Sequence, residues 1–424
     1  MPDVKPIAPV RIGGTDIVYA QGVRAGNWLF FTGHMATDFE HGLAAAVAGK
    51  PGLPLAQPRY RREGDFIIDR FARLIAAEGG DLRHIVRVDQ YYPSAKFVNA
   101  YQRARKAVLK DYVPPSTSVL MEELLVNGAS MDVSMLAVLP GENRMPVAAP
   151  PSVPVPQHSG FIPSLIMGDY VFVAGQMPNN VEMTAIEPRA WRPRNALWNG
   201  TDIRLQADFL ITDRLKPALE AGGSSLRNAV KAQVYLADIE DLPEFMDVWN
   251  GHFGANPCAL TVVPTSGLGL TESIIEINIF GVRDAGRIRK EIIAHKPSEP
   301  MRLGPAAVRA GDLVCLSALY AADENGALPA SRAAASLRYF GAPVQHQMRA
   351  ILDAAEAIAQ AGGTSLANVT RAHHFVPDLN VVLPALKVWQ ERLPGTPLPF
   401  GAVRTPPLPI PGCDVVLDAW FYRP

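Results

Sequence analysis

The sequence has few cysteines and no close pairing among them. Its 424 residues contain three cysteines, which form no CxxC motif: Cys258, Cys315 and Cys413. A sparse and odd set of this kind excludes a disulfide framework and a structural zinc site. The histidines are scattered and never take the HxxxH spacing of a helical metal site, so we expect no bound metal.

The sequence also lacks clustered charge and long apolar runs. Its formal net charge is −1, and no stretch has the dense Lys and Arg content of a surface that binds nucleic acid or anionic lipid. No run reaches the roughly 18 apolar residues that span a bilayer, and residues 1–10 do not read as a signal peptide. We therefore expect a cytoplasmic protein with no nucleic acid and no membrane among its partners.

The sequence does contain one long repeat. A Gly-Asn or Gly-Asp turn followed by a strand of apolar or small residues occurs three times, as VRAGNWLFFTGHM (Val23–Met35), LIMGDYVFVAGQM (Leu165–Met177) and VRAGDLVCLSALY (Val308–Tyr320). The turn glycines are 142 and then 143 residues apart: Gly26, Gly168 and Gly311. The units of solenoid proteins repeat every 20–50 residues or so, roughly a third of this period or less. A period of this length therefore predicts three copies of a whole domain.

Each copy has the same predicted order of strands, helix, strand, helix and strands, which favours an α+β fold with helices on one face of a sheet. The apolar positions of the first helix share one face and are Ile67, Phe71, Leu74 and Ile75. Glycine pairs end the matching helices, at Gly79-Gly80, Gly222-Gly223 and Gly362-Gly363. We predict domains at 1–143, 158–284 and 299–424. Residues 144–157, rich in proline, and the charged residues 285–298 are the predicted linkers.

These motifs resemble those of the RidA/YjgF/YER057c/UK114 family. Besides the repeated turn and strand, the Tyr19–Val23 segment (YAQGV) resembles the family's Tyr-x-Gln-x-Val, and Gly175–Met177 (GQM) resembles its Gly-Gln-Ile. The resemblance implies the family's chorismate mutase-like domain. That domain typically assembles as a homotrimer with sheets inside, helices outside and ligand pockets between neighbours. Three tandem copies then imply a pseudo-three-fold trimer in one chain, present in solution as a monomer or a simple dimer.

The resemblance also implies an activity. Family members hydrolyse reactive enamines and imines, release ammonia, and need neither a metal nor an organic cofactor. A polar pocket with a positioned water supplies general acid–base and electrostatic help. In the family, an arginine in a Pro-x-Arg-(Ser/Thr) segment anchors the substrate carboxylate. The matching segments here lack that arginine and read PPST at 114–117, PCAL at 257–260 and PFGA at 399–402.

Five residues form the candidate site that the resemblance implies. Tyr19 is the only phenol at the family's tyrosine position, and Asp418 is the only acid at its late-strand glutamate position. The other copies have Phe161 and Gly304 at the first position and Ser134 and Asn278 at the second. His34 follows Gly33 on the strand expected to border the pocket, and Arg404 is a candidate replacement for the missing arginine. We predict catalytic roles for Tyr19, His34 and Asp418, and substrate binding by Arg404 and Gly33.

The predicted site lies between the first and third copies, which carry these polar residues and become neighbours when the ring closes. The leading hypothesis is a cofactor-independent hydrolase or deaminase acting on a small enamine, imine or related C–N substrate. One alternative is a non-catalytic module that binds a small molecule or a protein. Another is a cyclic-amide hydrolase on a related three-fold scaffold, which would require a Lys–Ser dyad that the repeats lack.

Two further side chains have competing interpretations. His373 aligns with Asp89 and Gln233 of the other copies, so we expect it near the central axis, as a polar group that fixes strand register. Cys258 lies beside the position of the family arginine, and it fits a small buried residue better than a nucleophile because no base is adjacent.

Overall fold

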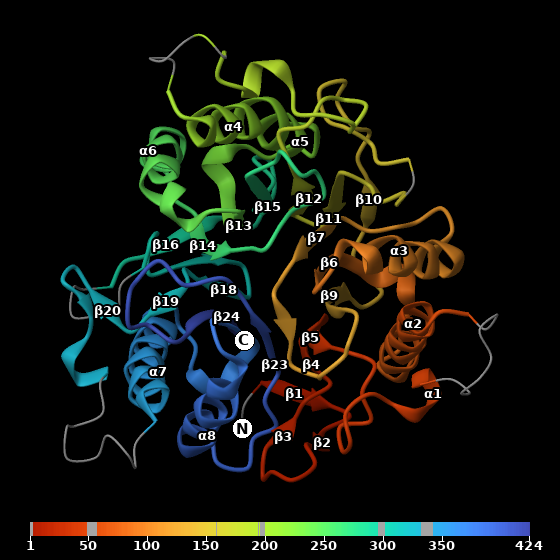
Figure 1. The fold of residues 1–424 in the computed structure, drawn as a ribbon, viewed down its shortest axis with the longest axis vertical. Coiled ribbons are helices and arrows are strands. Elements are labelled where there is room, and N and C mark those ends of the chain that lie inside the picture. The colour runs from red at the N-terminus through yellow and green to blue at the C-terminus, as the bar shows by residue number, and fades with distance from the viewer. Residues whose placement is uncertain are drawn as a thin grey trace.

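The computed structural model describes residues 3–48, 57–157, 159–193, 195, 200–295, 302–331 and 342–424. Across these residues, three mixed sheets surround a common centre, and helices cover the outside (Figure 1). The main strands follow one order in all three sheets. Within the described ranges, no helix is both long and apolar enough to cross a membrane.

The first sheet has the order β1-β4-β5-β9-β6-β7. Its strands are β1 (Val4–Ile7), β4 (Gly22–Ala25), β5 (Trp28–His34), β9 (Asp132–Val138), β6 (Ile85–Tyr92) and β7 (Ser116–Leu120). Only β6 and β7 are parallel, and helix α3 (Ala95–Leu109) connects them. Helix α2 (Arg59–Ala77) packs on the sheet through Ile67, Phe71 and Ile75, which are fully buried. The predicted helical face is therefore confirmed at these three positions.

Short elements complete this part of the chain: α1 (Ala45–Ala48), β2 (Val10–Arg11), β3 (Val18–Tyr19) and β8 (Glu123–Leu124). Strands β2 and β3 form a separate hairpin. Strand β8 leaves the first sheet and pairs with β23 of the third sheet, so the two sheets share an edge.

The second sheet has the order β10-β11-β12-β15-β13-β14. Its strands are β10 (Arg144–Pro146), β11 (Ser164–Met167), β12 (Tyr170–Gln176), β15 (Ile275–Val282), β13 (Ala229–Leu236) and β14 (Ala259–Pro264). Helix α4 (Asp202–Leu210) continues through a π-helical turn, Ile211–Leu215, into α5 (Lys216–Ala221). Helix α6 (Leu242–Phe253) connects the parallel strands β13 and β14.

The third sheet repeats this order as β16-β17-β18-β24-β22-β23 and then adds β8. Its strands are β16 (Lys290–Ile293), β17 (Ala307–Ala310), β18 (Leu313–Leu316), β24 (Val416–Tyr422), β22 (Val369–Val376) and β23 (Phe400–Arg404). Strand β19 (Leu319–Tyr320) also pairs with β24, and β20 (Ala322–Asp323) pairs with β21 (Gly326–Ala327). Helices α7 (Pro343–Ala361) and α8 (Val382–Arg392) lie outside this sheet.

The two predicted linkers each contain an edge strand. Strand β10 lies in residues 144–157, and β16 lies in residues 285–298. Proline is tolerated at a sheet edge because an edge strand leaves some N–H groups outside the ladder, and Pro146 ends β10. Residues 296–298 of the second predicted linker, and residues 158 and 299–301 at the predicted domain starts, lie outside the described residues.

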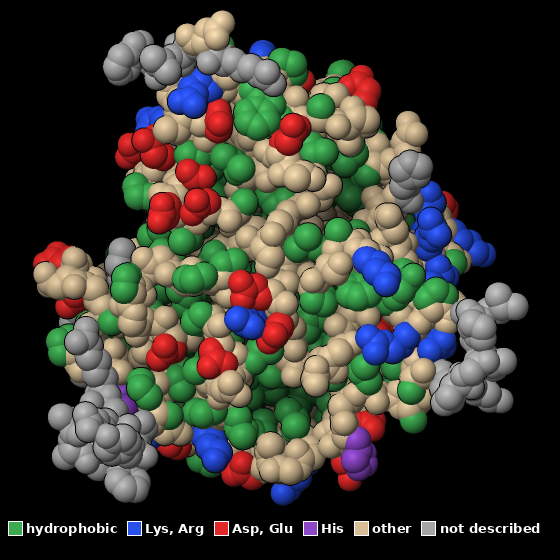
Figure 2. Space-filling model, viewed as in Figure 1, with side chains coloured by type: hydrophobic (Ala, Val, Ile, Leu, Met, Phe, Trp, Pro, Cys, Tyr) green, Lys and Arg blue, Asp and Glu red, His purple; other side chains and the backbone are tan. Residues whose placement is uncertain are grey.

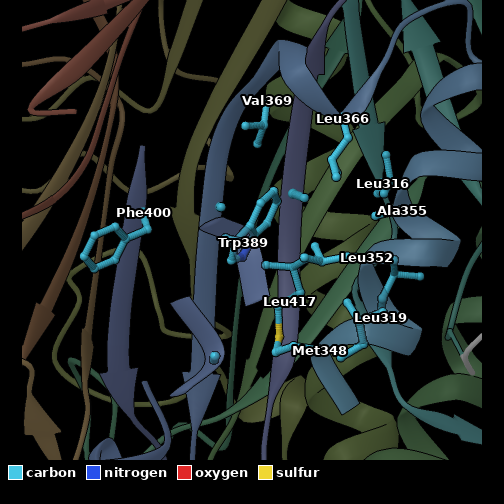
Figure 3. Packing of buried hydrophobic residues seen from close by; sticks show 14 of the residues in the cluster. Leu316, Leu319, Met348, Leu352, Ala355, Leu366, Val369, Trp389, Phe400 and Leu417 are labelled. Atoms are coloured by element: carbon cyan, nitrogen blue, oxygen red, sulfur yellow. The ribbon is translucent and has the colours of Figure 1, made fainter. Parts of the chain in front are cut away.

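Each sheet buries its outer face under its own helices and its inner face against the other sheets. Figure 3 shows one outer core, where Trp389 of α8 and Met348 and Leu352 of α7 pack toward Leu417 of β24. The inner cores draw on all three sheets. One contains Trp28, Phe172 and Trp420, and the other contains Tyr91, Tyr235 and Phe375. The ring is therefore held by apolar burial on both faces of every sheet.

Backbone hydrogen bonds close the three seams of the ring. The first sheet meets the third where Ala20 N donates to Leu398 O at 3.0 Å, and it meets the second where Ile162 N donates to Val113 O at 2.9 Å. The third meets the second where Ala318 N donates to Leu260 O at 3.0 Å. Residues near the two ends of the chain thus become neighbours at the first seam.

Candidate functional site

Asp418 lies in a buried network of charged side chains at the centre of the ring. Its carboxylate is 2.7 Å from Lys231 Nζ and 3.2 Å from Arg371 Nε, and all three side chains are nearly or fully buried. Gln233 and Thr261 each donate a further hydrogen bond to it at 3.0 Å. Burial opposes its charge, but Lys231 and Arg371 hold the pKa of Asp418 below its usual range. This carboxylate joins the second and third sheets.

The strand register explains why this network forms. His373 pairs with Asp418, as Asp89 pairs with Ser134 and Gln233 pairs with Asn278, so the three sheets present equivalent positions. The predicted alignment of His373, Asp89 and Gln233 is confirmed. Two positions before Asp89, Gln233 and His373, the three central strands carry the cations Arg87, Lys231 and Arg371. The guanidinium of Arg371 also lies 3.3 Å from the Asp89 carboxylate. Sequence reasoning missed these cations, although Arg87 and Lys231 each lie between two apolar residues of a strand.

Arg404 is held at the surface by two glutamates. Its guanidinium lies 3.0 Å from Glu122 and 3.1 Å from Glu123, and its Nε donates to Pro377 O at 3.1 Å. The Arg404 side chain is 38% exposed and is absent from the lining of the cavity described next. Its charge is therefore compensated by residues of the β7–β8 region.

A cavity of about 330 Å³ lies at the seam between the first and third sheets. Its walls come from residues 12–42 and 125–127 on one side and from residues 379–402 on the other. Tyr19 and Gly33 are among the lining residues, whereas His34, Arg404 and Asp418 are not. Figure 2 shows a hollow lined by hydrophobic side chains between α8 and the β2–β3 hairpin. This volume suits a small organic molecule.

Two glycines meet at this cavity. Gly33 has a φ of +73°, and a Cβ placed on it would lie 2.7 Å from Gly401 Cα and from Phe400 O. A Cβ on Gly401 would in turn lie 3.2 Å from Gly33 Cα. Only glycine lets β5 and β23 approach this closely. The Gly33 N–H donates to Ser134 Oγ at 3.1 Å, which fixes the strand at this point.

Tyr19 is buried in the cavity wall with its hydroxyl engaged. The hydroxyl donates to Thr32 O at 2.5 Å, and the ring packs edge-on against Phe400 with centroids 5.3 Å apart. Burial and the nearby charge of Asp132 raise the pKa of Tyr19 well above its ordinary value. The phenol therefore stays protonated, and its oxygen keeps lone pairs that can accept a hydrogen bond.

His34 points away from the cavity, into the core under α2. Successive side chains of a strand alternate between faces, so Gly33 and Met35 line the cavity while His34 packs against Phe71, with ring centroids 4.6 Å apart. Its Nε2 lies 2.5 Å from Gln21 O, so this nitrogen carries the proton. Burial, helped by the charge of Arg70, lowers the pKa of His34 to about 3. The ring is therefore neutral.

Asp132 is a buried carboxyl that sequence reasoning missed. It is fully buried, and neither of its oxygens accepts a hydrogen bond from any described residue. His34 pairs with Val133, so Asp132 lies on the face of β9 that turns toward Gly33 and Met35. Burial raises the pKa of Asp132 to about 7, against the opposing charge of Arg371. The sequence does contain a signal for this residue, because an acid between the apolar residues Met131 and Val133 in a predicted strand indicates a buried carboxyl.

His373 lies directly behind Gly401. Its Nδ1 would be 3.0 Å from a Cβ on Gly401, and within the described ranges neither ring nitrogen has a hydrogen-bond partner. The ring stacks on Phe375 with centroids 4.5 Å apart, and burial, with the charge of Arg371 nearby, lowers the pKa of His373 well below its ordinary value. A neutral imidazole thus offers one donor and one acceptor beside the glycine contact.

The equivalent seam between the first and second sheets is packed differently. Gly175 takes the place of Gly33 and faces Thr117, whose Cγ2 would be 3.0 Å from a Cβ on the glycine. Glu276 matches Asp132, because both pair with a tyrosine of the central strand, and its Oε1 fills the space over Gly175. Burial raises the pKa of Glu276 to about 8.

Another cavity, of about 310 Å³, lies where the second and third sheets meet, and its lining includes Cys258 and Arg302. Burial raises the pKa of the Cys258 thiol to about 11, so this thiol is not an activated nucleophile. No group of three or more His, Cys, Asp or Glu side chains suited to a metal ion occurs within the described part of the chain.

The strand register also corrects the proposed positions of the missing arginine. It aligns Ser116 with Leu260 and Phe400, because these residues pair with equivalent positions of the central strands. The sequence alignment had matched Ser116 with Ala259 and Gly401 and was wrong by one residue in the second and third copies. Neither the sequence alignment nor the alignment by strand register places a cation at the position of the family arginine.

Comparison with known proteins gives matches to individual parts of the chain. Residues 155–282 match the family described as Endoribonuclease L-PSP. A RutC family protein of Pyrococcus abyssi is 32% identical over 102 residues, which cover 24% of this chain and 70% of the relative. A RutC family protein of Pyrococcus horikoshii is 30% identical over 117 residues, 28% of this chain and 82% of the relative.

Solved structures also match about a third of the chain. The yeast protein YEO7 shares 26% identity with a TM-score of 0.28, covering 33% of this chain and 99% of its own. The YjgF gene product of E. coli shares 21% identity with a TM-score of 0.27, covering 32% of this chain and 98% of its own.

Proposed function

The chain belongs to the RidA/YjgF family, which includes the RutC proteins it matches, and from this premise we propose a cofactor-independent hydrolase that converts a small imine or enamine into a carbonyl compound and ammonia. The reaction takes place in the cavity between β5 and β23. The observation that carries this proposal is the buried Asp132 carboxyl, which has no hydrogen-bond partner among the described residues. It is not itself a lining residue of the cavity, but its charge acts on Tyr19 in the cavity wall.

The proposed domains are residues 1–143, 158–284 and 299–424, arranged as a pseudo-three-fold trimer within one chain. The common strand order of the three sheets supports this division. Three domains fill a closed three-fold ring, so no further copy is needed to complete a seam. Light scattering should give a mass near the 45.9 kDa of one chain or twice that value. A mass near three chains would contradict the arrangement.

Asp132 is the proposed acid–base group. A carboxyl with a pKa of about 7 is present in both protonation states near neutral pH, which suits a group that both gives and takes a proton. As an acid it protonates the enamine carbon or the imine nitrogen. As a base it takes a proton from the water whose oxygen bonds to the iminium carbon. That proton passes to nitrogen, and the C–N bond breaks with its electron pair on nitrogen, so that ammonia leaves. The hydroxyl group gives its proton back to Asp132 as the carbonyl forms.

Tyr19 and His373 are the proposed positioning groups. The Tyr19 hydroxyl donates its proton to Thr32 O, so its oxygen is free to accept an N–H of the substrate. His373 offers two ring nitrogens without partners among the described residues, next to Gly401. These contacts would orient the C–N bond and the attacking water.

His34, Arg404 and Asp418 have other roles in this proposal. His34 is neutral and packs under α2, Arg404 is paired with two glutamates, and Asp418 is neutralised by Lys231 and Arg371. Of the five residues predicted from sequence, Tyr19 and Gly33 are kept in the proposed site, and Asp132 replaces Asp418 as the acid.

An RNA-cleaving activity fits this cavity poorly, although the matched family bears the name Endoribonuclease L-PSP. Binding of RNA depends on cations that contact phosphates, and on aromatic rings that stack on bases. No Lys or Arg is among the described residues that line the cavity. The whole chain has a formal net charge of −1.

The test is the rate of ammonia release from imines generated in situ by an amine or amino-acid oxidase, with and without the protein. Asp132→Asn keeps the shape of the side chain but cannot give or take a proton near neutral pH, so kcat/KM should fall by about 100-fold or more. Glu276→Gln is the matched control at the other seam and should stay within about twofold of wild type. Full activity in Asp132→Asn would overturn the proposed site.

A further inference from the structure

The cavity between β5 and β23 has no Lys or Arg among its described lining residues. Most of its walls are apolar, and they include Ile12, Ile17, Phe39, Leu383, Leu386 and Phe400. Glu40 is the one carboxylate among the lining residues, and it is exposed at the surface. Tyr19 is the other ionisable lining group and remains protonated. The described lining residues therefore carry either no charge or a negative one, and Lys387 lines a neighbouring hollow that shares Thr15 and Leu383 with this cavity.

The nearest buried cation is already committed to the protein backbone. Arg70 donates to Met35 O at 3.1 Å and to Thr37 O at 2.5 Å, and so holds the lining segment in place. Its guanidinium lies 4.7 Å from the centre of the Phe39 ring, whose side chain lines the cavity. Arg70 is 7% exposed, and burial lowers its pKa.

Two further cations, one on β22 and one at the end of β23, form ion pairs with carboxylates of the protein. Arg371 binds Asp89 and Asp418, and Arg404 binds Glu122 and Glu123. A carboxylate brought into the cavity would find no free cation among the described lining residues. It would also lie near Asp132, and burying an uncompensated charge in apolar surroundings is costly.

From this arrangement we infer that the substrate is an uncharged imine or enamine of an apolar aldehyde or ketone, without a carboxylate or phosphate group. The inference rests on the proposed hydrolase function and narrows its substrate class. One water and one imine give one carbonyl compound and one ammonia, so no oxidant, reductant or further reactant is consumed. The reaction that supplies such a substrate is the oxidation or dehydration of an apolar amine compound that has no acid group.

Binding of two matched ligands tests the inference without relying on turnover. Phenylacetamide and phenylacetate share ring, chain length and shape, and differ in that the second is an anion at neutral pH. The amide should bind at least about tenfold more tightly by titration calorimetry, because the carboxylate loses hydration without gaining a partner. Equal or tighter binding of phenylacetate, or no binding of the amide, would overturn the inference.

A cation added at the cavity rim should change this preference. Leu383 lines the cavity from α8 and is 40% exposed, so Leu383→Arg can be accommodated without burying the new charge. Its affinity for phenylacetate should rise about three- to fivefold, the scale of a partly exposed ion pair, with little change for the amide. Val108→Arg is the matched control, since Val108 is 51% exposed on α3 and does not line this cavity. An equal gain in the control would contradict a local effect.

Turnover of two imines distinguishes a failure of the uncharged-substrate inference from a failure of the hydrolase proposal. The imine of phenylacetaldehyde, made from phenethylamine by an amine oxidase, should be hydrolysed with a higher kcat/KM than the α-imino acid made from phenylalanine. If the α-imino acid is the better substrate and Asp132→Asn abolishes its turnover, the hydrolase proposal stands and the uncharged-substrate inference fails. If neither imine is hydrolysed faster than without protein, the hydrolase proposal fails, and the binding preference alone decides whether the cavity selects uncharged ligands.

Discussion

The seams on either side of the first sheet occupy equivalent positions in the ring and differ at one facing pair. Where the first sheet meets the third, Gly33 faces Gly401 and a cavity of about 330 Å³ opens beside them. Where the first sheet meets the second, Gly175 faces Thr117, and Glu276 reaches over the glycine. Thr117 and Glu276 together thus fill one seam at the place where the other is open.

A second difference lies in the helix that packs beside each seam. Arg105 of α3 is 1% exposed, and it donates to Ser116 Oγ at 2.7 Å and to Ser159 O at 3.5 Å, across the seam between the first and second sheets. At the seam between the first and third sheets, α8 presents Leu386 and Leu383 to the cavity instead. In a homotrimer, symmetry would force all seams to change together, whereas one chain allows each seam to change alone.

The largest expected effect is a loss of stability when the buried charge network around Asp418, at the centre of the ring, is broken. Asp418→Asn removes the charge that Lys231 and Arg371 compensate, and leaves these cations buried without it. Breaking a buried ion pair by removing one partner costs about 3–5 kcal/mol. Urea denaturation should show this loss in the free energy of unfolding, and a loss below about 1 kcal/mol would contradict the role assigned to Asp418.

The next effect comes from copying the filled seam into the open one. Gly401→Thr introduces the residue found at the equivalent position 117, and its Cβ would lie 3.0 Å from His373 Nδ1 and 3.2 Å from Gly33 Cα. We expect kcat/KM for imine hydrolysis to fall about 100-fold, the scale of misplaced reacting groups. The protein should remain folded by circular dichroism and lose its affinity for phenylacetamide.

The reciprocal change, Thr117→Gly, provides the control for this experiment. It removes a buried side chain from the filled seam and should cost about 1 kcal/mol of stability, as small buried deletions and added glycine do. Activity should stay within about twofold of wild type, because Thr117 does not line the open cavity. A strong loss of activity in Thr117→Gly would assign the site to the other seam.

The last expected effect is on the pH dependence of stability. Asp132 and Glu276 have pKa values of about 7 and 8 in the folded protein, above their unfolded values of 3.8 and 4.5. The folded state therefore binds more protons between these limits, and the two groups make stability fall as the pH rises through this range.

Asp132→Asn should flatten the pH profile of unfolding free energy up to about pH 7, and Glu276→Gln should flatten it up to about pH 8. Urea denaturation at closely spaced pH values would measure both profiles. Profiles parallel to that of the wild type would mean that these carboxyls are not buried as described.

Much of the fold could be predicted from sequence because its signals are local and occur three times. The turn glycines, the apolar helix faces and the glycine pairs at helix ends each specify a segment without reference to the rest of the chain. The edge strands β10 and β16 were missed because their prolines and charges suit an exposed edge and do not alternate as a central strand does.

The candidate site was harder to predict, since it depends on which strand positions face each other across a seam. The family resemblance predicted Tyr19, and the repeated hairpin contains Gly33; both line the cavity. Asp418 was predicted because it is the one acid at the family's glutamate position. The register shows two other buried acids, Asp132 and Glu276, each two residues before the position equivalent to Asp418 on its own strand. The partners of Arg404, on β8, follow from an edge pairing between distant segments that sequence spacing does not reveal.

A crystal structure of the protein soaked with phenylacetamide would test most directly that the open seam is the functional one. We expect one bound molecule in the cavity between β5 and β23, with its ring against Phe400 and Leu386 and its amide toward Tyr19 and Gly33. Density for the ligand beside Gly175 and Thr117, or beside Cys258 and Arg302 with the first cavity empty, would contradict the account.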